Sequence, residues 1–241
     1  MISSHGIVLH TTRYTDTQVI VSVFTERAGL ISFLIKYRRT RTQGRLHAST
    51  WQPLSAVEVT WHQQERRSLQ KPTEFVTWQP RTSIPFHPHK AVIALFLGEF
   101  LYHALRGEAE NRPLFEFLNH SLNWLDTAEA HFANFHIVFL LWLTRFLGFY
   151  PNVDDWHEGC FFDMLNASFT PVQPLHSHYI GPEEAALVPK FMRLDMRKMG
   201  VVGLNRVVRR RTLQLIIDFY RLHVPEFPDL KSVDVLAEVF D

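Results

Sequence analysis

The sequence predicts an α+β protein in which a small β-barrel precedes an all-helical domain. Up to about residue 80, apolar and other side chains alternate with a period of two, which is typical of strands. From Ile84 onward, apolar residues recur every three or four positions, which is typical of amphipathic helices. The charge also divides: residues 1–80 carry ten Lys and Arg against five Asp and Glu, while the remainder carries 15 against 19. We therefore expect two domains, at residues 1–80 and 81–241.

Five short strands are expected in the first domain, because β-branched and aromatic residues alternate there between turn residues. Ala28 and Gly29 make one tight turn, and a polar hairpin tip runs from Gln63 to Ser68. Five antiparallel strands of this length suit a closed barrel of the OB type, since closure removes exposed sheet edges. The expected strands are Gly6–Tyr14, Val19–Phe24, Leu30–Tyr37, Val57–Trp61 and Phe75–Trp78.

A strongly basic loop follows the third expected strand. Five cations fall within ten positions, with no acid among them: Lys36, Arg38, Arg39, Arg41 and Arg45. Such a run is either a solvated loop or a groove for a polyanion, because Lys and Arg release condensed counterions when they meet phosphates. OB barrels add aromatic faces on which bases stack. The candidates for stacking are Tyr14, Tyr37, Trp51 and Trp61, although most of them could equally fill the barrel.

Helices are expected through most of the second domain. Pro85 and Pro88 mark a short linker, and Gly107 ends the first helix. Pro113 suits the first turn of the next helix. The following segment, 129–147, is apolar nearly all round, which is typical of the central helix of a bundle. Further helices are expected at about 204–223 and from Ser232, a candidate N-cap; residues 152–181 show no sustained period and are expected to be irregular.

Composition argues against several classes of protein. Cys160 is the only cysteine, so an intrachain disulfide is impossible and nothing indicates an oxidising compartment. The N-terminus has no signal-peptide pattern, and the most apolar run, 135–150, is shorter than the ~20 residues of a spanning helix. We expect a cytoplasmic protein. The chain has no Gly-rich phosphate loop and no His-Glu-x-x-His pair, so an enzyme is unsupported.

Two further groups of residues could carry a function. Zinc accepts mixed Cys and His ligands, so His157, Cys160, His176 and His178 are metal candidates, although the His-x-His spacing strains one tetrahedral site. An enzyme built around these histidines is the weakest hypothesis. A second basic cluster consists of Arg206, Arg209, Arg210 and Arg211. It is a solvated helix face, an extension of a DNA path, or a site for an acidic peptide.

The order of these features resembles the RecO family of bacterial recombination mediators. The resemblance lies in the opening Gly6–Leu9, the stretch Phe24–Ser32 and the run Lys36–Arg45. It continues in Gln52–Leu54 and Val57–Val59, and near the C-terminus in Tyr220–Pro225 and Leu230–Leu236. It covers nearly the whole chain.

The resemblance implies an OB-fold domain and a helical domain that often carries a four-cysteine zinc loop. It implies a DNA repair protein, not an enzyme, that binds single- and double-stranded DNA and anneals complementary strands. The implied partners are the tail of the single-stranded DNA-binding protein, RecR and, indirectly, RecA. Cys160 stands alone where zinc-binding members have four cysteines. We therefore expect no metal cofactor, and a loop at 152–181 packed by Phe161, Phe162, Phe169 and Tyr179.

Two functional hypotheses follow. The first is a mediator whose phosphate contacts come from Lys36, Arg38, Arg39, Arg41 and Arg45, with Arg13 as an addition. The second is a helical protein-interaction module that binds the acidic tail of a partner through Arg206 and Arg209–Arg211, with DNA binding secondary.

Overall fold

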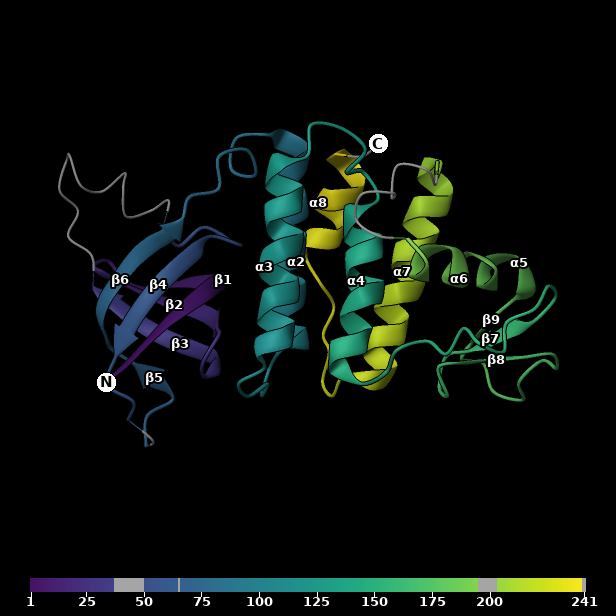
Figure 1. Cartoon of the computed structure of the whole chain (residues 1–241), viewed down its shortest axis with the longest axis horizontal. Coiled ribbons are helices and arrows are strands. Elements are labelled where there is room, and N and C mark those ends of the chain that lie inside the picture. Colours follow the sequence, from purple (N-terminus) through teal and green to yellow (C-terminus); the bar gives the residue numbers. More distant parts are fainter. Residues whose placement is uncertain (37–49, 65, 195–202, 240–241) are drawn as a thin grey trace. The chain divides into compact units, whose positions relative to one another are not determined.

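The structure is a computed structural model that describes residues 1–36, 50–64, 66–194 and 203–239 (Figure 1). The described chain folds into two compact units. The first unit, Met1–Thr127 with Leu230–Val239, contains a six-stranded sheet and three helices among its described residues. The second unit, Ala128–Asp229, contains the other helices and a three-stranded sheet. The predicted α+β class is confirmed, and the domain boundary at residue 80 stays a prediction.

The sheet of the first unit follows the order β5-β3-β2-β1-β4-β6. All neighbouring strands are antiparallel except β3 and β5, which are parallel. The five predicted strands are present, and β5 is added to them. Because β5 has only two residues, it carries no readable periodicity. The strands are β1 (Ile2–Thr15), β2 (Gln18–Thr25), β3 (Gly29–Lys36), β4 (Ala56–Trp61), β5 (Leu69–Gln70) and β6 (Pro72–Gln79).

Aromatic rings fill the concave side of this sheet. Phe33 of β3 meets Trp61 edge-on with ring centroids 5.3 Å apart, and it meets Phe75 of β6 at 6.3 Å. Contact between β3 and β6 requires the sheet to curl on itself. Trp61 is fully buried, and its Nε1 donates to Gln63 Oε1 at 2.6 Å. Trp61 therefore fills the core of the curled sheet and offers no face to a base, and Trp51 is partly buried against the same core. The sheet is a half-barrel with β5 and β6 at its two ends, so the expected closure of the barrel is not seen in the strand order of the described residues.

The described part of the first unit also contains three helices: α2 (Pro88–Ala104), α3 (Arg112–Thr127) and α8 (Ser232–Val239). Helix α2 packs against β1 and against α8. Gly98 lets α2 approach β1 closely, because a Cβ there would lie 2.9 Å from the Leu9 carbonyl oxygen. Gly29 adopts φ +68°, and a Cβ there would lie 2.1 Å from Glu108 O. Leu30 N donates to that same oxygen at 3.3 Å. The two glycines thus allow close backbone approach, Gly98 between α2 and β1 and Gly29 between the start of β3 and the segment that joins α2 to α3.

Glu99 of α2 fixes the start of α8. Its carboxylate accepts the backbone N–H groups of Lys231 at 3.0 Å and Ser232 at 2.9 Å, and also the Ser232 hydroxyl. Burial by itself would raise the pKa of Glu99, but these hydrogen bonds hold it below its ordinary value. Ser232 was the candidate N-cap of this helix, but its hydroxyl donates a hydrogen bond to Glu99. The acceptor for the first backbone N–H groups of α8 is instead the Glu99 carboxylate.

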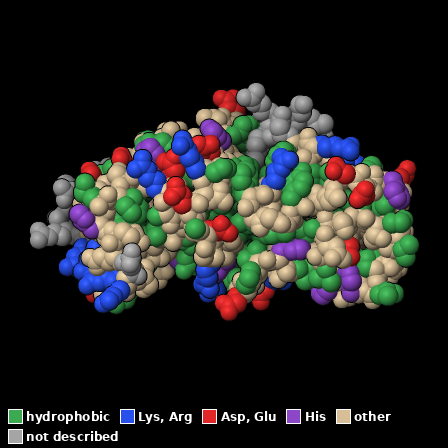
Figure 2. Space-filling view, turned by 60° about the horizontal axis from the view of Figure 1, so that its bottom comes forward, with side chains coloured by type: hydrophobic (Ala, Val, Ile, Leu, Met, Phe, Trp, Pro, Cys, Tyr) green, Lys and Arg blue, Asp and Glu red, His purple; other side chains and the backbone are tan. Residues whose placement is uncertain are grey.

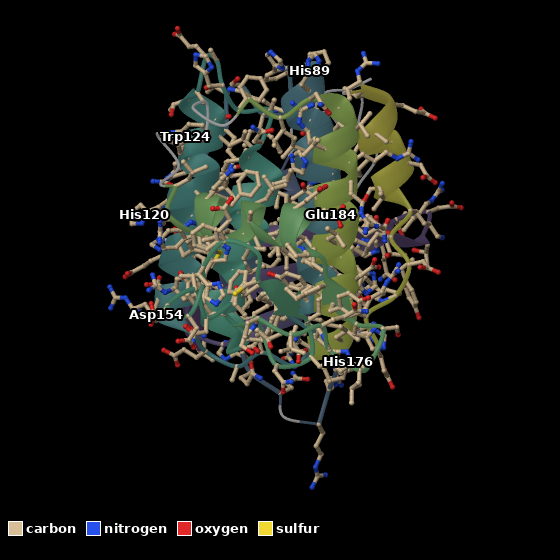
Figure 3. The ribbon with its side chains drawn as sticks, turned by 90° about the vertical axis from the view of Figure 1, so that its right-hand side faces the viewer. His89, His120, Trp124, Asp154, His176 and Glu184 are labelled. Carbon is tan, nitrogen blue, oxygen red and sulfur yellow. The ribbon has the colours of Figure 1, made fainter. Side chains whose placement is uncertain are left out.

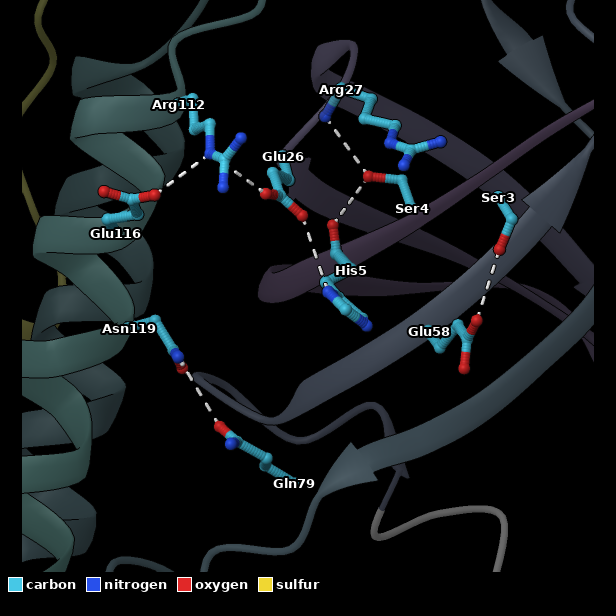
Figure 4. A network of polar contacts seen from close by, with 10 residues as sticks. All are labelled: Ser3, Ser4, His5, Glu26, Arg27, Glu58, Gln79, Arg112, Glu116 and Asn119. Carbon is cyan, nitrogen blue, oxygen red and sulfur yellow. Dashed lines mark hydrogen bonds and ion pairs between the residues drawn. The ribbon is translucent and has the colours of Figure 1, made fainter.

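A polar network joins the sheet to α3 (Figure 4). Glu26, after β2, lies 3.4 Å from His5 Nδ1 through one carboxylate oxygen and 3.6 Å from Arg112 Nε through the other. Arg112 also meets Glu116 at 3.0 Å. The His5 ring stacks on Trp78 of β6 with centroids 3.8 Å apart. One face of the Trp78 ring is therefore already stacked against a side chain of the same protein.

The second unit is built around α4 (Phe135–Leu147), which is buried on nearly every face, as predicted. Tyr220 of α7 (Arg206–His223) is fully buried and donates its hydroxyl to Leu140 O at 2.7 Å. Gly148 ends α4 with φ +86°, the left-handed conformation of a glycine C-cap. Two short helices, α5 (Pro182–Ala185) and α6 (Leu187–Met192), complete the helical part.

The expectation that residues 152–181 are irregular is corrected in part by the structure. They contain a three-stranded antiparallel sheet in the order β8-β7-β9, made of β7 (Phe161–Asp163), β8 (Ser168–Thr170) and β9 (Tyr179–Ile180). Strands of two or three residues are too short to show a period of two. The expected aromatic packing is observed: Phe162 and Phe169 are buried, and the rings of Phe161 and Tyr179 meet edge-on. Among the described residues, no helix is both long and apolar enough to cross a membrane.

Candidate nucleic-acid interface and partner pocket

The structure describes only the first residue of the predicted basic loop. Lys36 is the last residue of β3, is exposed, and pairs with Gln18 of β2. Arg38, Arg39, Arg41 and Arg45, together with Tyr37, lie outside the described residues. The chain is described again from Thr50, and Gln52 and Pro53 lead into β4.

Arg13 lies on β1 opposite Val19 of β2, and Val19 in turn faces Ile35, the neighbour of Lys36 on β3. Arg13 and Lys36 thus lie on β1 and β3, which are separated by β2. Because neighbouring strands are about 5 Å apart, the backbones of β1 and β3 are about 10 Å apart. Arg13 forms an ion pair with Asp16, but both side chains are largely exposed, so the pair stabilises little. Tyr14 is 59% exposed and is the predicted stacking residue that the described structure leaves most accessible beside these cations.

A second basic segment borders the same sheet, and the sequence patterns had not singled it out. Arg66, Arg67 and Lys71 are exposed on either side of β5, which pairs with β3. Buried Gln70 fixes this turn: its amide donates to Gln64 O at 3.0 Å and to Arg67 O at 2.7 Å, and its oxygen accepts from Gln64 N at 3.0 Å. In the sequence, the two adjacent arginines within the expected hairpin tip could have indicated this basic segment. In Figure 2, Lys and Arg side chains gather at the left of the view.

Two carboxylates lie on β4 and β6, at the other end of the strand order. Glu58 of β4 accepts from the Ser3 hydroxyl at 3.2 Å, and Glu74 of β6 is exposed. The carboxylates are thus divided, because Asp16 and Glu26 lie in the turns that follow β1 and β2. Among the described cations, Arg13 and Lys36 lie on β1 and β3, while Arg66, Arg67 and Lys71 flank β5. Strands β4 and β6 contain no Lys or Arg, so a polyanion is attracted more strongly to β1, β3 and β5 than to β4 and β6.

The second unit contains an apolar cavity of about 430 Å³, within the size range of ligand pockets. Its walls come from α4, the β7–β9 sheet, α5, α6 and α7. Val207, at the start of α7, is 78% exposed and also lines it. The lining residues are Leu141, Pro151, Phe162, Ile180, Glu183, Glu184, Leu187, Val188, Phe191, Val207, Val208, Arg211, Thr212, Leu215, Ile216 and Phe219.

The four arginines at the start of α7 have different roles. Arg211 lines the cavity and forms a two-point ion pair with Glu184 of α5, with Nε–Oε1 at 2.6 Å and Nη2–Oε2 at 3.1 Å. The hydrogen bond to Glu184 raises the pKa of Arg211 above its ordinary value. Arg209 is bound within the fold, donating to Asn134 Oδ1 and Leu204 O at 3.0 Å each, and burial lowers its pKa. Arg206 and Arg210 are exposed.

Arg206 is the first residue of α7, where the helix macrodipole is positive, and Arg209–Arg211 follow in the second turn. Asn205 caps α7 by accepting from Val208 N at 2.9 Å, and no acidic residue lies in the first turn. Cations at this end of a helix are unfavourable, whereas an anionic ligand would be stabilised by both the dipole and the guanidinium groups. The apolar cavity with a cationic rim therefore fits a ligand that carries an apolar side chain next to carboxylates.

The metal candidates divide into two separate contacts. Cys160 is buried, and its Sγ lies 3.1 Å and 3.2 Å from the two ring nitrogens of His157. His176, labelled in Figure 3, lies 3.3 Å from Asp163 through Nε2 and accepts from His178 N through Nδ1. Within the described ranges, no three His, Cys, Asp or Glu side chains gather as a set that could hold a metal ion. The structure does not bring the four predicted ligands together.

Comparison with known proteins covers both parts of the chain. Residues 1–81 match the family described as Recombination protein O N terminal, and residues 86–233 match Recombination protein O C terminal. The chain is 51% identical over 237 residues to the DNA repair protein RecO of Bacteroides fragilis, covering 98% of each chain. It is 47% identical to the RecO protein of Phocaeicola vulgatus, over 98% of this chain and 97% of the relative. It is 33% identical to that of Porphyromonas gingivalis over the full length of both.

Proposed function

The chain belongs to the RecO family of DNA repair proteins, and on that premise we propose that it is a recombination mediator. It binds single- and double-stranded DNA, anneals complementary strands, and helps load the RecA recombinase onto strands coated by single-stranded DNA-binding protein. It acts on the nucleoid in the cytoplasm, with RecR as a partner, and performs no covalent chemistry itself. The observation that carries this proposal is the group of exposed cations on β1, on β3 and on either side of β5.

The DNA path in this proposal begins at the basic loop. Lys36, Arg38, Arg39, Arg41 and Arg45 contact phosphates, and Arg13 adds a contact from β1. The turn with Arg66, Arg67 and Lys71 extends the path along β5, because β5 pairs directly with β3. Tyr14 offers an exposed ring for base stacking. Glu58 and Glu74 keep the DNA away from β4 and β6.

Salt titration tests this path. Five neutralised phosphates on a single strand give a slope of log affinity against log salt of about −3.5, and additional phosphates make it steeper. Fluorescence anisotropy with a labelled oligonucleotide, measured over increasing salt, is expected to give a slope at least that steep. Annealing of complementary fluorescent strands by the same protein tests the mediator role. A slope near zero, or no acceleration of annealing, would refute the proposal.

The second unit supplies the protein contact. We assign the acidic C-terminal tail of single-stranded DNA-binding protein to the cavity of about 430 Å³. Its apolar walls suit the buried side chain of such a tail, and Arg211 in the lining suits a carboxylate. Arg206 and Arg210 are exposed on the same helix, outside the lining, and are assigned to further carboxylates of the tail. Of the four arginines predicted for this role, Arg209 is the least suited, because it donates to Asn134 and Leu204.

This contact is the basis of the second candidate function, an interaction module in which DNA binding is secondary. Calorimetric titration with a synthetic tail peptide separates the two. We expect binding by the wild-type protein, loss of binding in Arg211→Ala, and unchanged binding in Lys190→Ala, which removes an exposed cation outside the cavity lining. No heat with the wild-type protein would exclude the tail from this cavity, whereas strong peptide binding without DNA binding would favour the second function.

A further inference from the structure

Glu184 already forms an ion pair with Arg211, the cation in the cavity lining that an acidic ligand would bind. Both of its carboxylate oxygens meet Arg211, at 2.6 Å and 3.1 Å, along the Nε–Nη2 edge of the guanidinium. This is the two-point geometry that a carboxylate of a peptide would use. Both residues line the cavity, and Glu184 is labelled in Figure 3.

We propose that Glu184 is an internal competitor that sets the affinity and charge selectivity of this cavity for acidic peptides. The inference rests on the proposed function of the cavity as a peptide site. An incoming carboxylate must either displace Glu184 from Arg211 or bind next to a like charge. Either route costs free energy that a neutral residue at position 184 would not impose.

The exposure of the pair makes exchange feasible. The side chains of Arg211 and Glu184 are 55% and 36% exposed, so water can solvate Glu184 once it is displaced. The carboxylate is therefore not trapped in the fold, unlike those of Asp126 or Glu99, which bind backbone N–H groups. A partner with a single carboxylate gains little by the exchange, whereas a run of carboxylates that extends beyond the lining can also pair with Arg206 and Arg210, which are exposed on the same helix. The cavity thereby discriminates strongly acidic tails from weakly acidic ones.

Paired glutamates on α5 provide a matched control. Glu183 and Glu184 are adjacent, both line the cavity, and both lie in the first turn of the helix. Across the described part of the chain, only Glu184 forms an ion pair with Arg211. Glu184→Gln and Glu183→Gln remove the same charge at neighbouring positions. A difference in peptide affinity between the two variants therefore measures the effect of the ion pair with Arg211, and not that of the negative charge around the cavity in general. Glutamine retains an oxygen acceptor at position 184, which preserves the fold.

The test is calorimetric titration of the intact wild-type protein and both variants with the acidic tail peptide. A second peptide has its acidic residues replaced by their amides. The Glu184→Gln variant is expected to bind the acidic peptide roughly tenfold more tightly than the wild type does. This gain in binding free energy is about that of one charge-assisted hydrogen-bond pair. Glu183→Gln is expected to change affinity by less than about twofold. The amidated peptide is expected to bind the wild type and Glu184→Gln equally.

Salt dependence gives a second readout. In the wild type, the Arg211–Glu184 pair has no net charge, so peptide affinity falls weakly with salt; in Glu184→Gln the free guanidinium makes the fall steeper. Equal affinity and equal salt dependence in the wild type and Glu184→Gln would overturn the role of Glu184 alone. An equal gain in Glu183→Gln would do the same. Failure of every form to bind the peptide would overturn the proposed peptide site and this inference with it.

Discussion

Asp126, in the last turn of α3, accepts the backbone N–H of Ile84 at 2.7 Å. The same carboxylate accepts the N–H groups of Thr82 and Ser83 at 2.9 Å each. Buried Lys90 completes the arrangement by donating to Ser83 Oγ and to Asp126 O. The segment expected to be a simple linker between domains is therefore fastened to α3, and it orients α2 against the sheet.

Replacing Asp126 by Ala is expected to destabilise the protein by about 2–4 kcal/mol, because three backbone donors lose their acceptor. Burial by itself would raise the pKa of Asp126, but the hydrogen bonds and then Arg81 hold it below its ordinary value. The stabilisation is therefore present above the unfolded pKa near 3.8 and is lost as pH falls through the folded pKa. Urea unfolding at pH 7 measures the loss. The exposed Glu129→Ala serves as control, and equal stability of the two variants would contradict the assignment.

Gly29→Ala is expected to cost about 3 kcal/mol or more. The positive φ contributes roughly 1 kcal/mol, and the new Cβ would collide with the backbone of Glu108 and Ala109. Gly107 provides the matched control, because its φ is +84° but a Cβ there meets nothing within 4 Å. Gly107→Ala should therefore show only the cost of the positive φ. Thermal or urea unfolding of both variants decides, and equal losses would rule out the close approach as the cause.

Acid is expected to destabilise the second unit through His136. Burial, and then the charge of Arg209, lower the pKa of this fully buried imidazole to about 3. The unfolded chain binds a proton below about pH 6.5 and the folded chain does not, so stability falls with pH by about 1.4 kcal/mol per unit below 6.5. Between pH 7 and pH 5, the wild type should lose about 2 kcal/mol more than His136→Leu. Parallel unfolding curves at the two pH values would contradict this.

The turn around β5 gives a prediction about DNA affinity. The triple variant Arg66→Ala, Arg67→Ala, Lys71→Ala should weaken DNA binding across sequences and make the salt slope shallower by about 2. Glu74→Gln, on the opposite edge, should leave the slope unchanged. Gln70→Ala keeps every cation but removes the bonds to Gln64 and Arg67, so it should weaken binding less. Anisotropy measures all three, and an unaltered slope in the triple variant would remove this turn from the path.

Periodicity was sufficient to predict the long elements of this fold. The alternation from Leu30 onward predicted β3, and the all-round apolar character of 129–147 predicted the buried α4, which begins later, at Phe135. Burial of a face or of a whole helix leaves a direct pattern in sequence. The three strands at 161–180 could not be predicted this way. Strands of two or three residues are stabilised by tertiary packing around Phe162 and Phe169, not by a local pattern.

The candidate sites were predictable in composition but not in geometry. The cationic cluster at 206–211 was evident, yet only the structure shows that Arg211 faces the cavity while Arg209 binds Asn134. Glu184 lies 27 positions from Arg211 and carried no signal of its own. Likewise, Gln70 gave no sign that it is the buried support of a basic turn. Such pairings depend on tertiary packing between distant segments, which residue spacing does not encode.

The most direct test of the central claim, that the basic loop leads DNA across this sheet, is the salt dependence of single-stranded DNA affinity in Arg38→Ala, Arg39→Ala, Arg41→Ala. The control variant is Lys190→Ala, Arg193→Ala, which removes two exposed cations of the second unit. Because the triple variant neutralises three fewer phosphates, its slope should be shallower than that of the wild type by about 2, while the control keeps the wild-type slope. An unchanged affinity and slope in the triple variant would contradict the account.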